Sequence, residues 1–378
     1  MANTPLKKVR VLIVDDSAFM RKVLETILIS DPQLQVIGHA KDGREAIALA
    51  ESLKPDVISM DINMPHMDGL QATAQIMTTN PRPIVVVSSE SKDGAASTLK
   101  ALELGAIEFI AKPNSAIDLD MQSIREDLLR KVKMAAKVRV VRTASRLAAA
   151  LQSTPQNGAP PITRPAPAVN RPSSSVTDQR FPVVVLAAST GGPATVMRLA
   201  PGFTKEFPAA VILVQHMPAA FTTQFAAQLA EFTEISVKEA ESGDVIQPGN
   251  LYICPGAQHL RVNPLGRIQL DSATGRIAGY LPNIDVTMES VAAYGGALSI
   301  GVVLTGMGAD GAQGAKAIKK AGGHVIAQDE TTSVIFGMPA EAIKLQAVDQ
   351  VLGLDDIYSA IEKRVIALTR ATPVGVRC

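Results

Sequence analysis

The sequence predicts two α/β domains, each built on a parallel sheet and joined by a long linker. The chain has 378 residues, enough for about two domains plus connecting material at roughly 150 residues per domain. Short apolar runs alternate with helix-length stretches in both halves. The 151–180 segment holds six prolines and no aromatic residue, so it cannot bury enough apolar surface to order itself. We place the domains at residues 7–126 and 181–370, with a basic helix end and the proline-rich linker at 127–180.

The first domain is predicted to have a flavodoxin-like fold with a five-stranded parallel sheet. Its expected strands are Val9–Val14, Gln35–Gly38, Val57–Met60, Ile84–Val87 and Ile107–Ile110. Helix-length stretches such as Phe19–Ile29 and Arg44–Leu53 separate these strands. Strands that alternate with helices form a doubly wound sheet. In the strand order 2-1-3-4-5, the first and third strands flank the crevice where such sheets bind ligands.

The second domain is predicted to be doubly wound and mostly parallel, with one antiparallel hairpin. Its expected buried strands are Val183–Ala188, Ala210–Val214, Ser299–Leu304 and Val325–Ala327. The hairpin is expected from Asn250–Asn263 and Gly266–Asp271, with Asn263, Pro264 and Leu265 at its turn.

Composition excludes several classes of function. Hydrophobic residues make up 47% and charged residues 19% of the chain, which favours a packed interior. The 37 Lys and Arg residues balance 36 Asp and Glu residues, so no excess positive charge is available for nucleic acid. Aromatic residues are only 3%, with no Trp, which disfavours stacking platforms for single strands. We therefore expect no nucleic-acid partner.

The N-terminus and the cysteines indicate a cytoplasmic protein. Cys254 and Cys378 are the only cysteines and lie far apart, which is no disulfide framework. The opening MANTPLKKVRVLIVDDS reaches two aspartates directly after a short apolar run, unlike a signal peptide. No apolar run approaches the roughly 18 residues of a membrane helix, so we expect no membrane insertion. We also expect a monomer.

A basic stretch precedes the linker. Residues 121–150 contain eight Lys or Arg residues and two acidic ones, a local excess of +6 (8 − 2). A solvated face of a terminal helix is the simpler interpretation. A docking surface for an acidic partner remains the alternative.

Three carboxylates end two predicted strands of the first domain. Asp15 and Asp16 close the run LIVDD, and Asp61 closes DVISMD. Converging carboxylates repel one another and need a cation, and their hard oxygen atoms suit Mg²⁺. Lys112 follows the fifth strand and Ser88 ends the fourth. This positive charge and this hydroxyl at the same edge are suited to hold an added phosphoryl group.

Residues 9–125 resemble a response-regulator receiver domain. The resemblance rests on VDDS, MDINMPHMDG, VVVSS and AKP. It implies that Asp61 accepts a phosphoryl group from a chemotaxis histidine kinase. It also implies that Asp15, Asp16 and Asp61 bind Mg²⁺ together with the backbone carbonyl of Asn63.

The same resemblance assigns roles to the other polar and aromatic residues of this edge. Lys112 would contact the phosphate, while Ser88 and Phe109 match the switch hydroxyl and the switch aromatic of receivers. Asp68, in the MDG turn, is expected to have only a turn role.

A hydroxyl, an imidazole and a carboxylate follow three predicted strands of the second domain. Ser189 lies in AASTGGP, His216 in VILVQHMP and Asp310 in LTGMGADG. A serine hydroxyl needs an adjacent base, and that base needs a carboxylate that fixes its tautomer. The order Ser, His, Asp and the absence of G-x-S-x-G disfavour a lipase-type esterase.

Other interpretations of these residues remain open at this point. Ser189 alone is a plausible helix cap. A phosphate-cradling loop is disfavoured because both G-x-G-x-x-G and G-K-[ST] are missing. His259, on the predicted hairpin, is the weaker candidate for the base and otherwise has a structural or substrate-side role. No cluster of His, Cys and carboxylates has the spacing of a zinc site.

Residues 183–367 resemble the catalytic domain of the chemotaxis protein-glutamate methylesterases, through AASTGGP, VQHMP, YICPGAQHL and LTGMGADG. The resemblance implies that Ser189 attacks γ-methyl glutamate esters of chemoreceptors while His216 takes the proton and Asp310 orients His216. The backbone N–H groups of Thr190 and Met307 would hold the oxyanion. It further implies deamidation of receptor glutamines, and no cofactor for ester hydrolysis.

The combination of domains implies regulation. The receiver is expected to cover the Ser189 edge at rest, and phosphorylation of Asp61 to shift the population toward an open form. The alternative function is a phosphorylation-dependent module that binds receptors or adaptors without catalysis. A DNA-binding output is disfavoured, because glycine-rich strand ends stand where a basic recognition helix is needed.

Overall fold

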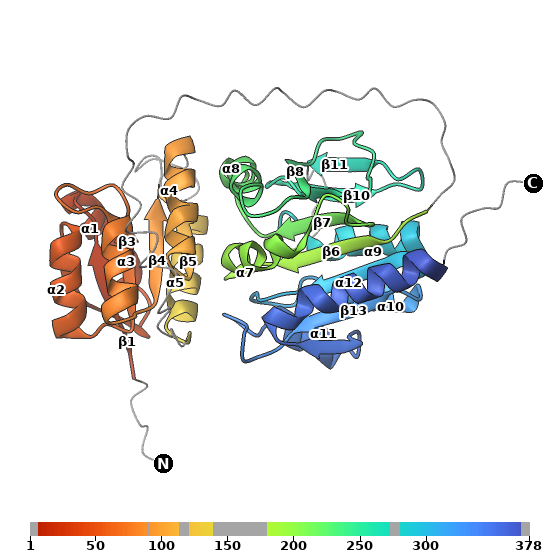
Figure 1. Ribbon diagram of the computed structural model, residues 1–378. Coiled ribbons are helices and arrows are strands. Elements are labelled where there is room, and N and C mark those ends of the chain that lie inside the picture. The colour runs from red at the N-terminus through yellow and green to blue at the C-terminus, as the bar shows by residue number, and fades with distance from the viewer. Residues whose placement is uncertain (1–6, 89–90, 113–120, 139–179, 273–279, 372–378) are drawn as a thin grey trace, which may run out of the picture.

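The structure is a computed structural model that describes residues 7–88, 91–112, 121–138, 180–272 and 280–371. It contains two α/β domains side by side, as Figure 1 shows. The predicted linker, apart from Arg180 at its end, and Cys378 lie outside the described residues. No helix in the described ranges combines the length and the apolar character needed to cross a bilayer.

The first domain has the predicted five-stranded parallel sheet in the order β2-β1-β3-β4-β5. Its strands are β1 (Val9–Val14), β2 (Leu34–Ala40), β3 (Val57–Asp61), β4 (Ile84–Ser88) and β5 (Glu108–Ala111). Its helices are α1 (Ala18–Ile29), α2 (Gly43–Leu53), α3 (Gly69–Thr79), α4 (Lys92–Glu103) and α5 (Met121–Ala135). The prediction of this fold is confirmed, with strand ends that lie at most two residues from those expected.

Alternating side chains of the strands explain why helices cover both faces. Leu12 and Val14 pack in one cluster with residues of α2, α3 and α4. Val11 and Ile13 pack in another with residues of α1 and α5. Because successive side chains of a strand point to opposite faces, a continuous apolar run such as β1 serves both layers.

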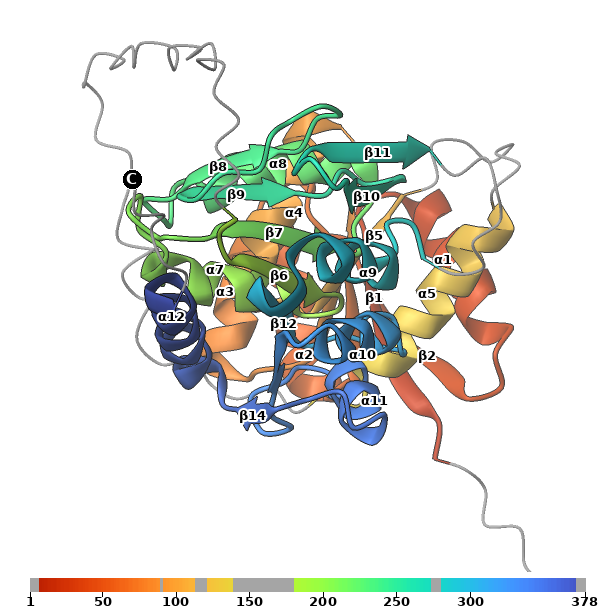
Figure 2. The same cartoon turned by 90° about the vertical axis from the view of Figure 1, so that its right-hand side faces the viewer.

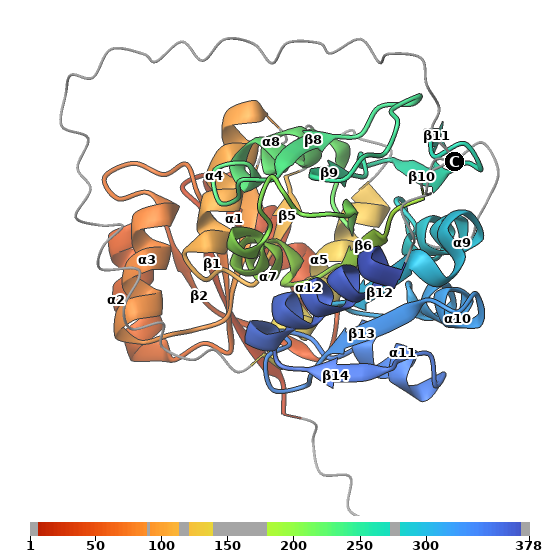
Figure 3. The same ribbon diagram turned by 45° about the vertical axis from the view of Figure 1, so that its right-hand side comes forward.

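The second domain has a seven-stranded sheet in the order β14-β13-β12-β6-β7-β9-β8, in which every described pairing is parallel. These strands are β6 (Val183–Ala188), β7 (Ala210–Gln215), β8 (Ser236–Glu239), β9 (Asn250–Ile253), β12 (Ser299–Val303), β13 (His324–Gln328) and β14 (Gln350–Leu352). The helices are α7 (Gly192–Leu199), α8 (Ala219–Leu229), α9 (Ile284–Gly295), α10 (Ala312–Lys320), α11 (Met338–Lys344) and α12 (Leu354–Ala371), with short 3₁₀ turns at Ala200–Gly202 and Gly296–Leu298. Figures 2 and 3 show α9 and α10 on one face of the sheet and α7 and α12 on the other.

The predicted hairpin is only partly right. The first hairpin strand was expected to run from Asn250 to Asn263. Its beginning, Asn250–Ile253, is instead strand β9 of the large parallel sheet and pairs with β7 and β8. Only β10 (Gln258–Val262) pairs antiparallel with β11 (Ile268–Ser272). The chain leaves the sheet at Gly256, where a Cβ atom would lie 2.3 Å from the backbone nitrogen of Ala219. A glycine permits this close approach of two backbones, and it divides what looked like one long strand.

The basic residues of α5 bind their own domain. Lys133 forms an ion pair with Asp31 at 2.6 Å, and Lys131 pairs with Asp127 at 2.9 Å. Lys131 also donates to the backbone carbonyl of Phe109. Lys131 and Lys133 are therefore engaged within the first domain, and residues 139–150 lie outside the described ranges.

The two domains share one apolar cluster. It joins α4 of the first domain to α7 and α8 of the second, and Figure 1 shows these helices facing one another. The ring of Phe109 lies 4.5 Å from that of Phe221, centroid to centroid. Gln228 of α8 donates to Glu103 of α4 at 3.5 Å. The contact thus combines apolar packing with a polar rim.

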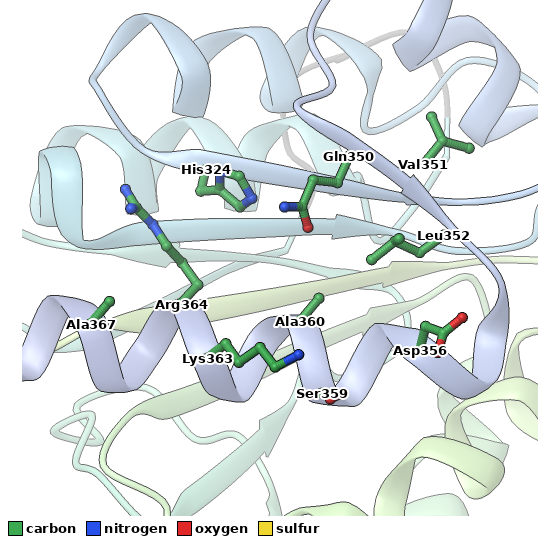
Figure 4. Close-up of a pocket in the computed structure, with 10 residues that line it drawn as sticks. All are labelled: His324, Gln350, Val351, Leu352, Asp356, Ser359, Ala360, Lys363, Arg364 and Ala367. Carbon is green, nitrogen blue, oxygen red and sulfur yellow. The ribbon is translucent and has the colours of Figure 1, made fainter.

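A groove of about 670 Å³ runs between α12 and the edge strand β14. Figure 4 shows His324, Gln350, Lys363 and Arg364 among the side chains that line it. Strands β12 and β13 separate β14 from β6, so the groove is distinct from the sheet edge at Ser189.

Candidate active site

The three carboxylates of the first domain converge as the strand order predicts. One ligand atom from each of Asp15, Asp16 and Asp61 can be chosen so that all lie within 4.8 Å of one another. Lys112 reaches this cluster, with Nζ 3.0 Å from Asp15 Oδ2 and 2.8 Å from Asp61 Oδ2. Burial raises the pKa of Asp61, against the opposing effect of Lys112. A cluster of three acidic groups and one cation retains negative charge, and its oxygen donors fit Mg²⁺.

The other residues expected at this edge have varied surroundings. Ser88 is buried, and its hydroxyl donates to the carbonyl of Gly94 at 3.2 Å. Asn63 is exposed, and its carbonyl accepts no backbone hydrogen bond from the described residues. Phe109 is buried against the second domain. Asp68 caps α3 by accepting from the Gln71 N–H at 2.7 Å, so its turn position also starts a helix.

Ser189 is held at the junction between β6 and α7. Its N–H donates to the Thr305 carbonyl at 3.1 Å, and its carbonyl accepts from the Gln215 side-chain amide at 2.8 Å. Gly191, with φ +74°, makes the turn into the helix, and a Cβ there would lie 2.6 Å from Val334. The turn therefore needs glycine both for its backbone angle and for space. Ser189 itself is only 8% exposed.

His216 bridges Ser189 and Asp310. Its Nδ1 lies 3.1 Å from Ser189 Oγ, and its Nε2 lies 2.7 Å from Asp310 Oδ2. An ionised carboxylate can only accept a hydrogen bond, so Nε2 carries the hydrogen that it donates to Asp310. In this tautomer Nδ1 has no hydrogen and can accept one from the Ser189 hydroxyl. The two ring nitrogens thus have roles opposite to those in chymotrypsin-like triads.

Asp310 is anchored at the N-terminus of α9. Its Oδ2 accepts from the Ile284 N–H at 2.9 Å and its Oδ1 from the Asp285 N–H at 3.0 Å. Burial alone would raise the pKa of Asp310, but the hydrogen bonds from His216 and Ile284 lower it overall. The carboxylate therefore stays ionised and keeps His216 oriented.

A glycine-rich loop lies against the nucleophile. A Cβ on Gly306 would come within 2.8 Å of Ser189 Cβ, so the loop that carries Met307 passes directly beside the hydroxyl. Neither the Thr190 N–H nor the Met307 N–H donates in the backbone hydrogen bonds of the described residues. Two free backbone donors beside the nucleophile suit an oxyanion.

His259 is not brought to Ser189. Its Nδ1 instead accepts from the Asn283 N–H at 3.1 Å, and its side chain is buried. Burial lowers the pKa of His259, which keeps it neutral and able to accept. Cys254 is buried too, and burial raises the pKa of its thiol to about 12, so it is no nucleophile.

Residues outside the motifs complete the site. Tyr280 stacks on the His216 ring, and Gln215 holds the Ser189 carbonyl. Gln215 adjoins His216 in the sequence, and its place at a strand end was the one available signal. Tyr280 follows a stretch without a strand or helix pattern, and no sequence feature pointed to it.

The first domain reaches the loops of this site. Arg130 of α5 has Nη1 4.0 Å from Met307 Sδ. Val334, which lies against Gly191, also packs on the apolar cluster beneath α1 and α5. The first domain therefore contacts both loops that flank Ser189.

Comparison with known proteins gives matches to both domains. Residues 184–361 match the family described as CheB methylesterase, and residues 11–125 match the response regulator receiver domain. A protein-glutamate methylesterase/protein-glutamine glutaminase of Halalkalibacterium halodurans is 39% identical across 94% of this chain and 98% of its own. One of the same name from Pyrococcus horikoshii is 43% identical across 95% of this chain and 94% of its own. The crystal structure of the Thermotoga maritima CheB methylesterase catalytic domain is 39% identical, covering 49% of this chain and 99% of that one, with a TM-score of 0.47.

Proposed function

Because the chain belongs to the protein-glutamate methylesterase/protein-glutamine glutaminase family, we propose that it hydrolyses glutamate γ-methyl esters, and deamidates glutamines, on chemoreceptors. The observation that carries the proposal is the hydrogen-bonded chain from Ser189 through His216 to Asp310, with steps of 3.1 and 2.7 Å. The protein acts in the cytoplasm as a monomer, without a nucleic-acid partner.

The chemistry follows from the position of each proton. His216 Nδ1 takes the hydroxyl proton as Ser189 Oγ attacks the ester carbonyl, and Asp310 stabilises the resulting imidazolium. The N–H groups of Thr190 and Met307 donate hydrogen bonds to the carbonyl oxygen as it becomes negatively charged. The proton on Nδ1 then passes to the leaving group as its bond to carbon breaks: to the methoxide oxygen, which leaves as methanol, or, with a glutamine substrate, to the amide nitrogen, which leaves as ammonia. Water next attacks the acyl-enzyme with His216 as base, which restores the hydroxyl.

The receiver controls access to this site. A histidine kinase of the chemotaxis pathway phosphorylates Asp61. Asp15, Asp16 and Asp61, together with the Asn63 carbonyl, would hold the Mg²⁺ that this transfer needs. When bound, Mg²⁺ neutralises charge at the phosphoryl group. Lys112, already beside Asp61, contacts the new phosphate, and the switch residues Ser88 and Phe109 respond to it. Phosphorylation shifts the population away from the form in which the receiver covers Ser189.

Methanol release from methylated receptors tests the proposal. We expect acetyl phosphate with Mg²⁺ to stimulate release by the wild type, and Asp61→Asn to lose this stimulation but keep the basal rate. Ser189→Ala should abolish release, whereas Ser236→Ala, an exposed serine on β8, should match the wild type. Full release by Ser189→Ala would overturn the catalytic proposal and favour the binding-module alternative.

Deletion of residues 1–180 should raise the unstimulated rate, and an unchanged rate would overturn the covering role of the receiver.

A further inference from the structure

Tyr280 covers one face of the histidine of the candidate triad. The two rings are stacked, with centroids 4.4 Å apart and planes 17° from parallel. Ser189 and Asp310 meet the imidazole at its two nitrogens, in the plane of the ring. Tyr280 therefore supplies a contact that neither of them provides, against the flat face.

The segment that carries Tyr280 also holds the carboxylate of the triad. We call residues 280–285, which lead into α9 and include its first two residues, the strap. Within it, the N–H groups of Ile284 and Asp285 donate to Asp310. The Asn283 N–H donates to His259, and the Asn283 side chain caps α9 by accepting from the Val286 N–H at 2.9 Å. One short segment thus contacts two of the three triad residues and is fixed at its centre.

The electrostatics of an aromatic face suit the step in which His216 acts. When Ser189 attacks, the imidazole becomes a cation, and an aromatic face within about 6 Å attracts a cation. Stacked rings also resist tilting, which keeps Nδ1 aimed at the hydroxyl. The Tyr280 hydroxyl lies toward Gly308, where an added Cβ would be 3.3 Å from the oxygen. The hydroxyl thus lies beside the glycine-rich loop that carries Met307, and the ring is the part that stacks on His216.

We propose that Tyr280 is a positioning residue, whose ring holds His216 between Ser189 and Asp310 and stabilises its protonated form. This inference rests on the proposed function, because it assigns His216 the role of general base. It adds a third contact to the imidazole from a loop that none of the sequence motifs includes.

The test compares the ring with its hydroxyl in the full-length protein. Methanol release from methylated receptors is measured over pH with acetyl phosphate and Mg²⁺. We expect Tyr280→Phe to stay within about twofold of the wild type, because the stacked face is retained. Tyr280→Leu should lower kcat by about 10- to 100-fold with little change in KM, as expected when a reacting group is misplaced. Tyr294→Leu, which removes a tyrosine of α9 outside the strap, controls for lost packing.

The pH profile separates positioning from general destabilisation. Without the aromatic face the imidazolium is less stable, so the acid limb of the kcat profile should move to lower pH by about half a pH unit. Among the described residues, Asp310 bonds to His216, and Asp285 and His259 interact electrostatically with Asp310; none of these three changes between the variants. Tyr280→Met serves as the second variant if the leucine variant does not fold.

Two outcomes would overturn the inference. One is a wild-type kcat and pH profile in Tyr280→Leu or Tyr280→Met. The other is a defect in Tyr280→Phe as large as that in Tyr280→Leu, which would assign the role to the hydroxyl. Neither outcome touches the proposed function, whose failure would appear as full methanol release by Ser189→Ala.

Discussion

The two candidate sites occupy the same place in two related sheets but compensate buried negative charge in different ways. Both lie at the carboxyl ends of parallel strands, where doubly wound folds bind ligands. In the receiver, Asp15 and Asp61 share the ammonium group of Lys112. In the second domain, Asp310 faces the backbone N–H groups that begin α9, together with His216. The topology sets the position, and the compensating groups set the chemistry.

The pKa directions of the two aspartates express this difference. Burial raises the pKa of Asp61, because Lys112 is shared with Asp15 and does not offset the lost hydration. Burial acts on Asp310 too, yet the hydrogen bonds from His216 and the backbone bring its pKa below the usual value. The receiver carboxylate thus favours an added cation, whereas the triad carboxylate is already satisfied.

The largest expected effect tests the satisfied carboxylate. Asp310→Asn removes the charge that selects the His216 tautomer and stabilises the imidazolium, so we expect kcat for methanol release to fall by about 10⁴-fold. Asp271→Asn is the matched control, because Asp271 is exposed on the β10–β11 hairpin. A fall of less than about tenfold in Asp310→Asn would contradict the comparison, since Asp310 would then matter no more than an ordinary hydrogen bond.

The sequence alone was enough to predict which residues lie together at the carboxyl ends of the strands. Asp15, Asp61 and Ser189 come directly after largely apolar runs, and His216 follows another run after one intervening residue. Parallel strands bring their carboxyl ends to one edge. The same reasoning located Asp310 beyond β12. The order of the receiver strands was also predictable, because its five strands and intervening helices are regular.

The rest depended on contacts that have no local pattern. Tyr280 and the strap approach the site through the packing of α9, and His259 joins them through one backbone hydrogen bond. Strands β8 and β14 are short and lie at the sheet edges, so their residues do not form a fully apolar run. The break at Gly256 was missed because the need for glycine there arises from Ala219, far away in the sequence.

Stability should respond in opposite directions to the same substitution at the two sites. A raised pKa means that ionised Asp61 is less stable in the folded state, so Asp61→Asn should stabilise the metal-free chain by about 0.5–2 kcal/mol. A lowered pKa means that ionised Asp310 stabilises the fold above its unfolded pKa of about 4, so Asp310→Asn should cost about 1–3 kcal/mol. Calorimetry at neutral pH without Mg²⁺ measures both, and a shift in the same direction for both variants would contradict the comparison.

Removal of the Lys112 ammonium group should increase the affinity of the receiver carboxylates for Mg²⁺. In Lys112→Ala the carboxylates lose the charge that competes with an entering cation, so we expect Mg²⁺ to bind about tenfold tighter. Isothermal titration calorimetry measures this change. Lys100→Ala, which removes an exposed lysine of α4 paired with Glu103, should leave the affinity unchanged. Weaker binding in Lys112→Ala would show that Lys112 helps to arrange the ligands rather than competing with the metal.

The smallest expected effect on kcat concerns the strap, whose backbone N–H groups compensate the charge of Asp310. His259→Leu leaves every triad residue in place but removes the acceptor for the Asn283 N–H, so the strap should loosen and kcat should fall several-fold, by about the value of one hydrogen bond.

Because burial lowers the pKa of His259, its contribution to stability is complete above the unfolded pKa of about 6.5 and is lost as the pH falls toward the lower folded pKa. The wild type should therefore lose stability between about pH 6.5 and pH 5 by more than His259→Leu does, as thermal unfolding would measure. Equal losses in the two proteins would mean that His259 does not hold the strap through its neutral form, and that the N–H groups of Ile284 and Asp285 support Asp310 without its help.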